Sequence, residues 1–174
     1  MKKFLFKLSR RRFMGLPIGF ILTYFPFLIP VKKTACNKKV VSFHHPAPAY
    51  PNHILLVPRK IVKTIFHLNA EDFFEIVTMA AKIYQDIDTN FTLLINGGER
   101  QDVVQAHFHL FTDDNGSKKL LNENGIGFLP DDKFFWGQIA GNLHTLLAQN
   151  GISENCFTML AQFKKNTKPS LYFI

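Results

Sequence analysis

The sequence contains few cysteines, one tryptophan and no low-complexity tract. Two cysteines in 174 residues cannot build a disulfide scaffold, and the lack of a repeat at a fixed period excludes a solenoid. Hydrophobic residues make up 47% of the chain, which excludes intrinsic disorder. The length is enough for one domain with a packed core and too small for two ordinary ones.

Acidic residues are absent from the first twelve positions, which hold six of the 21 Lys and Arg residues. Setting those six aside leaves 15 basic against 13 acidic residues, so the formal charge falls from +8 to +2. The basicity therefore belongs to a tail and not to a surface that follows a phosphate backbone. We expect no nucleic-acid partner.

An uncharged, apolar segment at residues 13–31 follows the basic tail. This order of charge and hydrophobicity is typical of a secretory signal or a membrane anchor, and SRRRFM at residues 9–14 resembles a twin-arginine export motif. We therefore expect a chain that is membrane-anchored or exported to the extracytoplasmic side. In the alternative, residues 25–31 form a buried strand of the fold, and the protein is cytoplasmic.

The remaining sequence favours an α+β fold, an antiparallel sheet with one main helix plus a C-terminal helix and hairpin. Strands cluster around the main helix and do not alternate with helices. The expected helices are 70–87, with Asn69 as its N-cap, and 136–150; the expected strands are 40–43, 53–57, 91–95, 103–111, 157–163 and 171–174.

These elements suggest three parts of one chain. Residues 1–36 would be the basic tail and the signal or anchor segment. Residues 37–115 would form the core, and residues 116–174 would extend the same domain with a helix and strands. The role of that extension is open.

The predicted strand 103–111 carries the chemistry. Alternation along a strand puts Gln105, His107 and His109 on one face and the apolar residues on the other. Two neutral imidazoles at i and i+2 can act on one phosphate, one as nucleophile and the other as hydrogen-bond donor.

The paired histidines allow two other interpretations. They could be a solvated pair on an exposed strand, or they could hold zinc together with His44, His45 or His53. Because no cysteine or acid stands at a ligand spacing, we expect no metal and no cofactor.

Two sequence blocks resemble the histidine-triad (HIT) family. QDVVQAHFHLF at residues 101–111 is similar to its signature, in which three histidines alternate with apolar residues after Gln-x-Val-x. FHHPAPAYPNHILLVPR at residues 43–59 is similar to its Phe-His-Asp loop and the strand that follows, and Asn96-Gly97-Gly98 matches its Asn-x-Gly turn. The resemblance covers about residues 40–112, in the family's own order of elements.

This resemblance implies a hydrolase or transferase that acts on a nucleoside phosphate ester, anhydride or phosphoramidate. His107 would attack the α-phosphorus to give a nucleotidyl-histidine intermediate, which water then cleaves without a metal. His109 would hydrogen-bond the phosphate or the leaving group. By the same resemblance, His53 would line the same pocket from the neighbouring strand, and Asn96 and Gln101 would hold the phosphate side of the substrate. Phe43 and His45 belong to the segment that resembles the family's nucleotide-binding loop.

Two of the departures from the family pattern fall at positions that bear on catalysis and nucleotide binding. Gln105 stands where the first triad histidine is expected, but it keeps the main-chain carbonyl that orients the nucleophile in the family. His45 replaces the acid that binds the ribose hydroxyls, which puts ordinary nucleoside recognition in doubt.

Three questions stay open at this stage. The spacing from Asn96 to Gln105 and the apolar N-terminus also resemble the membrane-anchored CDP-diacylglycerol diphosphatases. The two departures would also suit a catalytically silent nucleotide-binding protein. Family members are often homodimers, but the sequence does not show which faces would pair.

Overall fold

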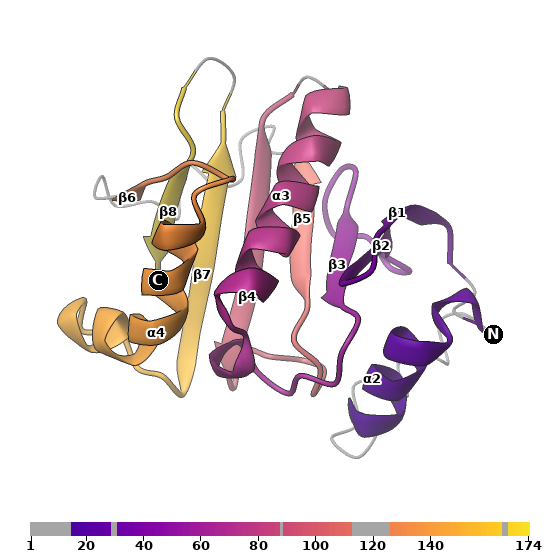
Figure 1. The fold of residues 1–174 in the computed structure, drawn as a ribbon, viewed down its shortest axis with the longest axis horizontal. Helices are drawn as coiled ribbons and strands as arrows, with labels where there is room; N and C mark the ends of the chain where they lie inside the picture. Colours follow the sequence, from indigo (N-terminus) through magenta and orange to yellow (C-terminus); the bar gives the residue numbers. More distant parts are fainter. Residues whose placement is uncertain (1–14, 29–30, 88, 113–125, 165–166) are drawn as a thin grey trace.

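The computed structural model describes residues 15–28, 31–87, 89–112, 126–164 and 167–174. Its described strands form one eight-stranded sheet in the order β1-β2-β3-β5-β4-β7-β8-β6 (Figure 1). Every pair of neighbours runs antiparallel, which confirms the α+β class. The predicted basic tail and export motif, within residues 1–14, lie outside the described residues.

The elements follow the expected order, with some shifted boundaries. The strands are β1 (Lys33–Cys36), β2 (Val40–His44), β3 (Ile54–Pro58), β4 (Phe91–Gly98), β5 (Phe108–Thr112), β6 (Ile126–Gly127), β7 (Cys156–Phe163) and β8 (Ser170–Phe173). The helices are α2 (Gly15–Tyr24), α3 (Ala70–Ile87) and α4 (Lys133–Gln149), with short 3-10 turns η2 (Pro26–Leu28) and η3 (Ile65–His67).

Helix α3 begins where the sequence predicted, because Asn69 and Asp72 cap it reciprocally. The Asp72 backbone N–H donates to Asn69 Oδ1 at 3.0 Å, and the Asn69 N–H donates to Asp72 Oδ2 at 2.8 Å. The two bonds satisfy donors that the first helical turn leaves without partners. Lys60 also forms an ion pair with Asp72, which ties the helix start to the segment after β3.

Helix α4 begins at Lys133, three residues before the predicted start. Asp132 is its N-cap and accepts a hydrogen bond from the Phe135 N–H at 2.9 Å. Trp136 therefore lies inside the first turn, where it is fully buried and stacks on Phe73 of α3 at 5.9 Å between ring centroids. In Figure 1, α3 and α4 lie side by side over the same face of the sheet.

The two faces of the sheet carry different side chains. On β3, Ile54 and Leu56 join the main core under the helices, whereas Leu55 and Val57 pack with Val41 and Phe43 in a smaller cluster on the other face. His109 pairs with Leu55 and therefore lies on that second face, as the alternation predicted.

The predicted C-terminal hairpin is confirmed as β7 and β8, and β7 extends the core sheet. It pairs with the whole of β4, from Phe91 opposite Phe163 to Gly98 opposite Cys156. Strand β4 is longer than the predicted 91–95 and includes the Asn96-Gly97-Gly98 segment that was expected to form a turn. The C-terminal residues thus flank the same strand that carries Asn96.

The N-terminal segment folds differently from the predicted alternative of a strand at residues 25–31, because Pro26–Leu28 form the 3-10 turn η2. Before it, α2 is ten residues long. None of the described helices combines the length and hydropathy that crossing a bilayer requires.

The packing of α4 on the sheet predicts a large cost for truncating its buried face. Leu143→Ala removes a side chain that is 1% exposed, and it should lower the free energy of unfolding by about 2–5 kcal/mol. Urea denaturation measures this change. Thr145→Ala, on the exposed side of the same helix, is the control and should change stability by less than about 0.5 kcal/mol. Equal effects for the two variants would show that α4 is not packed as described.

Candidate active site

The segment that carries the histidines is not a continuous strand. The sequence predicted a strand over 103–111, but β5 begins only at Phe108. The Gln105 N–H donates to the carbonyl of Val103 at 2.8 Å, and the Ala106 N–H donates to that of Val62 at 2.6 Å. These bonds bend the chain, so Gln105 and His107 precede the strand and only His109 lies within it.

Gln105 points into the protein and not into a pocket. Its side chain is 1% exposed, and its amide group binds the segment after β3: Oε1 accepts from the Val62 N–H at 3.2 Å, and Nε2 donates to the Lys60 carbonyl at 3.0 Å. The prediction that Gln105 shares an open face with His107 and His109 is therefore wrong. The physical reason is that a buried amide must find partners for both its donor and its acceptor.

The His107 side chain is hydrogen-bonded to the main chain of Gln105. Its Nδ1 lies 2.7 Å from the Gln105 carbonyl oxygen. A carbonyl only accepts hydrogen bonds, so Nδ1 carries the proton, and in the neutral ring Nε2 keeps its lone pair. His107 is half-buried, at the end of the bent segment. The arrangement prepares Nε2 as a nucleophile.

His109 has the opposite tautomer, which His53 imposes. The Ala49 N–H donates to His53 Nδ1 at 3.4 Å, so the proton of the neutral His53 ring is on Nε2. That Nε2 lies 2.9 Å from His109 Nδ1 and donates to it. The remaining proton of His109 is consequently on Nε2. His109 thus offers a hydrogen-bond donor where His107 offers a lone pair.

The two rings are close enough to act on one group. Their centroids are 4.9 Å apart and their planes are inclined by 64°. A phosphoryl group placed against both would meet an unprotonated nitrogen on one ring and an N–H on the other. This pairing suits nucleophilic attack with stabilisation of the phosphate oxygens.

Burial keeps these imidazoles neutral. Desolvation lowers the pKa of His53 to about 4, helped by His45 and His107, and it lowers the pKa of His109 to about 2, helped by His107, His53 and His45. Burial also lowers the pKa of His107, opposed by the hydrogen bond to the Gln105 carbonyl and by the charge of Asp102. Neutral rings retain the lone pair that the nucleophile needs.

His45 lies at the edge of the same cluster. Its ring stacks on His53 with centroids 4.2 Å apart and planes inclined by 8°, and its centroid is 5.9 Å from that of His109. Its Nδ1 accepts from the Ala47 N–H at 3.1 Å. The ring of Tyr50 also contacts His53, in an edge-to-face arrangement with centroids 5.5 Å apart. It stacks on Phe111 with centroids 4.2 Å apart. The loop between β2 and β3 therefore places the rings of His45 and Tyr50 against His53. The sequence analysis did not predict the contact of Tyr50.

Ligand nitrogens of His45, His53 and His109 lie within 4.8 Å of one another, which makes this group a candidate for a metal ion. Two features oppose such an ion. The hydrogen bond between His53 and His109 already uses one nitrogen of each ring. The parallel stack of His45 on His53 also keeps both rings from directing in-plane lone pairs to one point.

Asn96 shares a face with His109 but has a partner of its own. It lies two residues along β4 from Leu94, the residue paired with His109. Its Oδ1 accepts from Thr158 Oγ1 at 2.8 Å, and that hydroxyl also accepts from Arg100 at 3.0 Å. The sequence analysis did not predict either partner. Thr158 lies in the C-terminal extension, outside the segment that resembles the family, whereas Arg100 stands directly before the Gln101 block and could have been noticed there.

Gln101 and Phe43 hold the surroundings of the site together. The Gln101 amide donates to the carbonyls of Lys63 and Val103 at 2.6 and 2.7 Å, so it anchors the bent segment. Phe43 is buried in the small cluster with Leu55. The structure brings His45, His53, His107 and His109 into one group, and it places these two residues in supporting positions.

Comparison with known proteins gives a consistent family assignment. The HIT domain model matches residues 28–116, which include every histidine of the cluster. The chain belongs to the histidine-triad family. A relative annotated by name as an uncharacterized HIT-like protein, from Buchnera aphidicola subsp. Baizongia pistaciae (strain Bp), is 30% identical over 101 residues, which span 53% of this chain and 87% of that protein.

Solved structures share the fold of this HIT protein. Yeast Ap4A phosphorylase Apa2 matches with a TM-score of 0.51 and 11% identity, over 79% of this chain and 58% of its own. The same enzyme in complex with Ap4A matches with a TM-score of 0.54 and 12% identity, over 91% of this chain and 64% of its own. The chain thus spans about three fifths of the phosphorylase, and at this identity the likeness shows the fold alone.

The depressed pKa values predict that His53 and His109 stay neutral through the mildly acidic range. In histidine-resolved NMR spectra, their ring Cε1–H signals should not titrate between about pH 8 and about pH 5.5, whereas in urea they should titrate near the ordinary value of 6.5. A folded-state midpoint above about pH 6 for either ring would contradict the burial described.

The same shifts fix the sign of the pH effect on stability. Between about pH 6.5 and pH 4 the unfolded chain binds protons that the folded rings do not, so the free energy of unfolding should fall as the pH falls through this window. Urea denaturation at a series of pH values measures it.

Proposed function

We propose that this HIT protein hydrolyses or transfers a nucleotide from a phosphate ester, anhydride or phosphoramidate, with His107 as the nucleophile. The observation that carries the proposal is the pair of hydrogen bonds made by the adjacent rings, from which opposite tautomers follow. The Gln105 carbonyl holds the proton of His107 on Nδ1, and His53 holds that of His109 on Nε2. One ring attacks while the other donates.

The reaction has two displacements. In the first, the His107 Nε2 lone pair forms a bond to the α-phosphorus as the bond from phosphorus to the leaving group breaks. The ring becomes cationic, and the Gln105 carbonyl stabilises its Nδ1 proton. His109 Nε2–H hydrogen-bonds the phosphate or leaving-group oxygen. In the second, water attacks phosphorus and gives up a proton to the departed leaving group or to solvent, while the P–N bond breaks and its electron pair returns to Nε2 of the neutral ring. With another acceptor in place of water, the product is a transferred nucleotide.

Nucleotides are the appropriate first probes. The fold is that of a yeast phosphorylase whose structures contain Ap4A and AMP. No step assigned to His107 and His109 needs a metal ion, so we expect turnover of an adenosine 5′-phosphoramidate to continue in EDTA.

The proposal predicts a covalent intermediate on His107. Incubation with radiolabelled Ap4A or adenosine 5′-phosphoramidate, followed by rapid quenching, should give a protein adduct that is stable to alkali and labile to acid, as a phosphoramidate is. His107→Ala should lose the adduct and lower kcat by about a thousandfold or more, because the nucleophile is gone.

The matched control is His44→Ala, which changes the last residue of β2, a histidine outside the cluster. It should form the adduct and turn over at the parent rate. Turnover by His107→Ala at the parent rate would contradict the assignment of the nucleophile. Loss of activity in both variants would point to a general disturbance of the loop and not to chemistry at His107.

A catalytically silent nucleotide-binding protein is the second candidate function. It is favoured by Gln105 in place of the first triad histidine and by His45 in place of the ribose-binding acid. Thermal stabilisation of the parent by AMP or Ap4A without turnover or adduct would support it, because a ligand that binds only the folded state raises Tm. Measurable turnover that depends on His107 would exclude it.

A further inference from the structure

A compact group of exposed apolar side chains lies at the N-terminal end of the described chain. Ten large hydrophobic side chains are exposed among the described residues, and half of them fall within residues 20–28: Phe20, Tyr24, Phe25, Phe27 and Leu28, at 40–67% exposure. The four aromatic rings form one connected group. Their centroids are 4.9 Å apart for Phe20–Tyr24, 5.9 Å for Phe20–Phe25 and 6.0 Å for Phe25–Phe27. We call these five residues the aromatic surface. Exposed apolar patches of this kind mark interaction sites.

The inner side of α2 is fixed against the catalytic segment. Gly19 is buried, and a Cβ atom at this position would lie 2.5 Å from Gln105 Oε1 and 3.4 Å from Ile61. The helix can therefore approach closely only because residue 19 is glycine. This contact orients α2, so that Phe20 and Tyr24 face outward.

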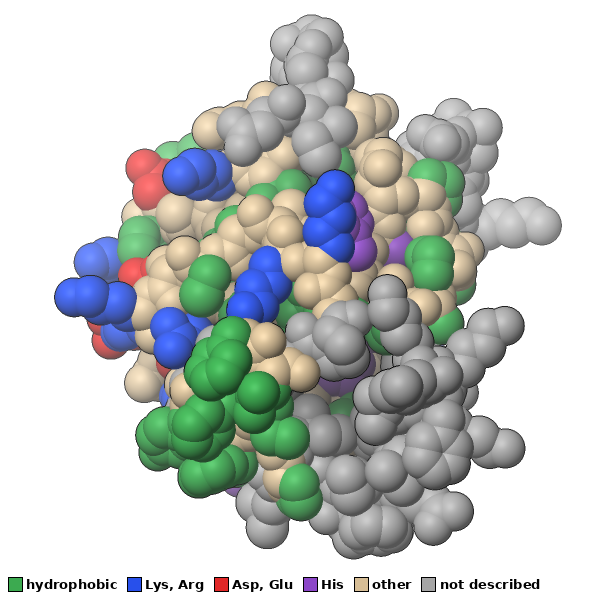
Figure 2. All heavy atoms as spheres, turned by 90° about the vertical axis from the view of Figure 1, so that its right-hand side faces the viewer, with side chains coloured by type: hydrophobic (Ala, Val, Ile, Leu, Met, Phe, Trp, Pro, Cys, Tyr) green, Lys and Arg blue, Asp and Glu red, His purple; other side chains and the backbone are tan. Residues whose placement is uncertain are grey.

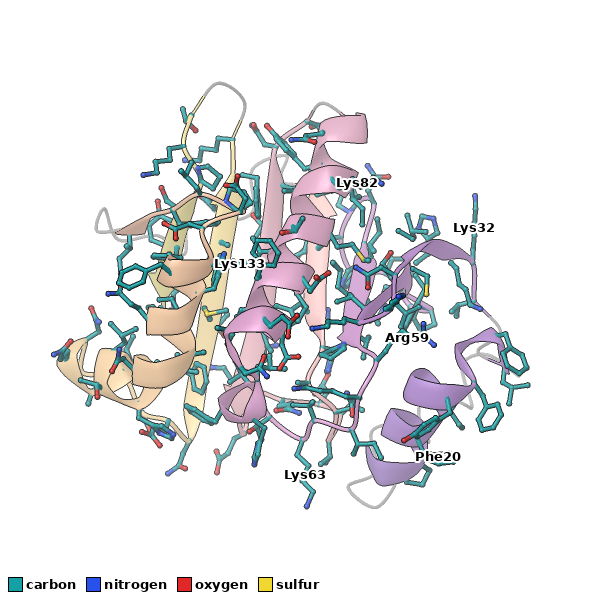
Figure 3. The ribbon with its side chains drawn as sticks, in the orientation of Figure 1. Phe20, Lys32, Arg59, Lys63, Lys82 and Lys133 are labelled. Carbon is teal, nitrogen blue, oxygen red and sulfur yellow. The ribbon has the colours of Figure 1, made fainter. Side chains whose placement is uncertain are left out.

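The N-terminal part of the sequence, which carries the aromatic surface, has charged residues of one sign only. The first 70 residues contain 13 Lys and Arg and no Asp or Glu, whereas residues 71–174 contain eight basic and 13 acidic residues, a net charge of −5. Figure 2 shows the apolar side chains gathered low on this face, with Lys and Arg beside them. In Figure 3, Lys32, Arg59 and Lys63 are spread around the helix that carries Phe20.

We propose that the aromatic surface docks on an anionic lipid bilayer, with α2 lying in the interface. Aromatic rings are suited to the headgroup level, and flanking Lys and Arg are attracted to acidic headgroups. The ten residues of α2 extend about 15 Å, half the thickness of a hydrocarbon core, so this helix lies on the bilayer and does not cross it.

Docking would place the bent segment with Gln105 next to the membrane, since Gly19 joins the two. The docking proposal itself does not depend on catalysis, and it is tested without it.

Vesicle co-sedimentation of the full chain tests the proposal. The parent should bind vesicles of phosphatidylglycerol and phosphatidylcholine, bind vesicles of phosphatidylcholine alone much more weakly, and release from the anionic vesicles as salt is raised. The double variant Phe20→Ser/Phe27→Ser should bind anionic vesicles at least about tenfold less tightly, because it removes two of the inserted rings. Lys32→Glu/Lys33→Glu should weaken binding to the anionic vesicles only.

Phe134→Ser is the matched control. Phe134 is 75% exposed on α4, away from the aromatic surface, and its replacement should leave binding unchanged. Equal Tm values for the two serine variants would show that both are folded. Parent-like binding by Phe20→Ser/Phe27→Ser would overturn the proposal, since it would assign binding to the basic residues alone. Absence of vesicle binding, with self-association that the same double variant abolishes, would also overturn it and assign the surface to a second copy of the chain.

Discussion

The hydrogen bond from His107 Nδ1 to the carbonyl of Gln105 is the interaction on which the account of this site depends. It is 2.7 Å long and comes from the main chain, so its acceptor survives any change of side chain at position 105. The bond decides which nitrogen of His107 is free. The second bond, from His53 Nε2 to His109 Nδ1, leaves the proton of His109 on Nε2, the nitrogen that is unprotonated in His107. Two otherwise similar imidazoles thereby acquire different roles.

The rest of the fold keeps these bonds in place. The Gln105 side chain binds the carbonyl of Lys60 and the N–H of Val62, and the Gln101 side chain binds the carbonyl of Lys63, so two glutamines attach the bent segment to the chain after β3. Phe108 and Leu110 then bury themselves under the helices and force His109 to the opposite face. A glutamine at the first triad position is accordingly compatible with an intact site, because its amide anchors the backbone and its main-chain carbonyl still holds His107.

Local patterns predicted the parts of the structure that local physics determines. The alternation of Phe108, His109 and Leu110 gave the correct faces, and Asn69 was correctly identified as a helix cap. The start of α4 was misplaced although Asp132 carries the same kind of signal as Asn69. The bend before β5 had no such signal, because it depends on the Ala106 bond to Val62, a residue 44 positions earlier. The pairing of Asn96 with Thr158, across 62 positions, was equally beyond local reasoning.

The central claim is that adjacent rings carry their protons on different nitrogens, and 15N-resolved NMR of the histidine rings measures this directly. Spectra of uniformly 15N-labelled protein near neutral pH, assigned with single histidine variants, distinguish a protonated from an unprotonated ring nitrogen. The account predicts a proton on Nδ1 and none on Nε2 for His107, and the reverse for His109. The same tautomer on both rings, or a proton on His107 Nε2, would contradict it.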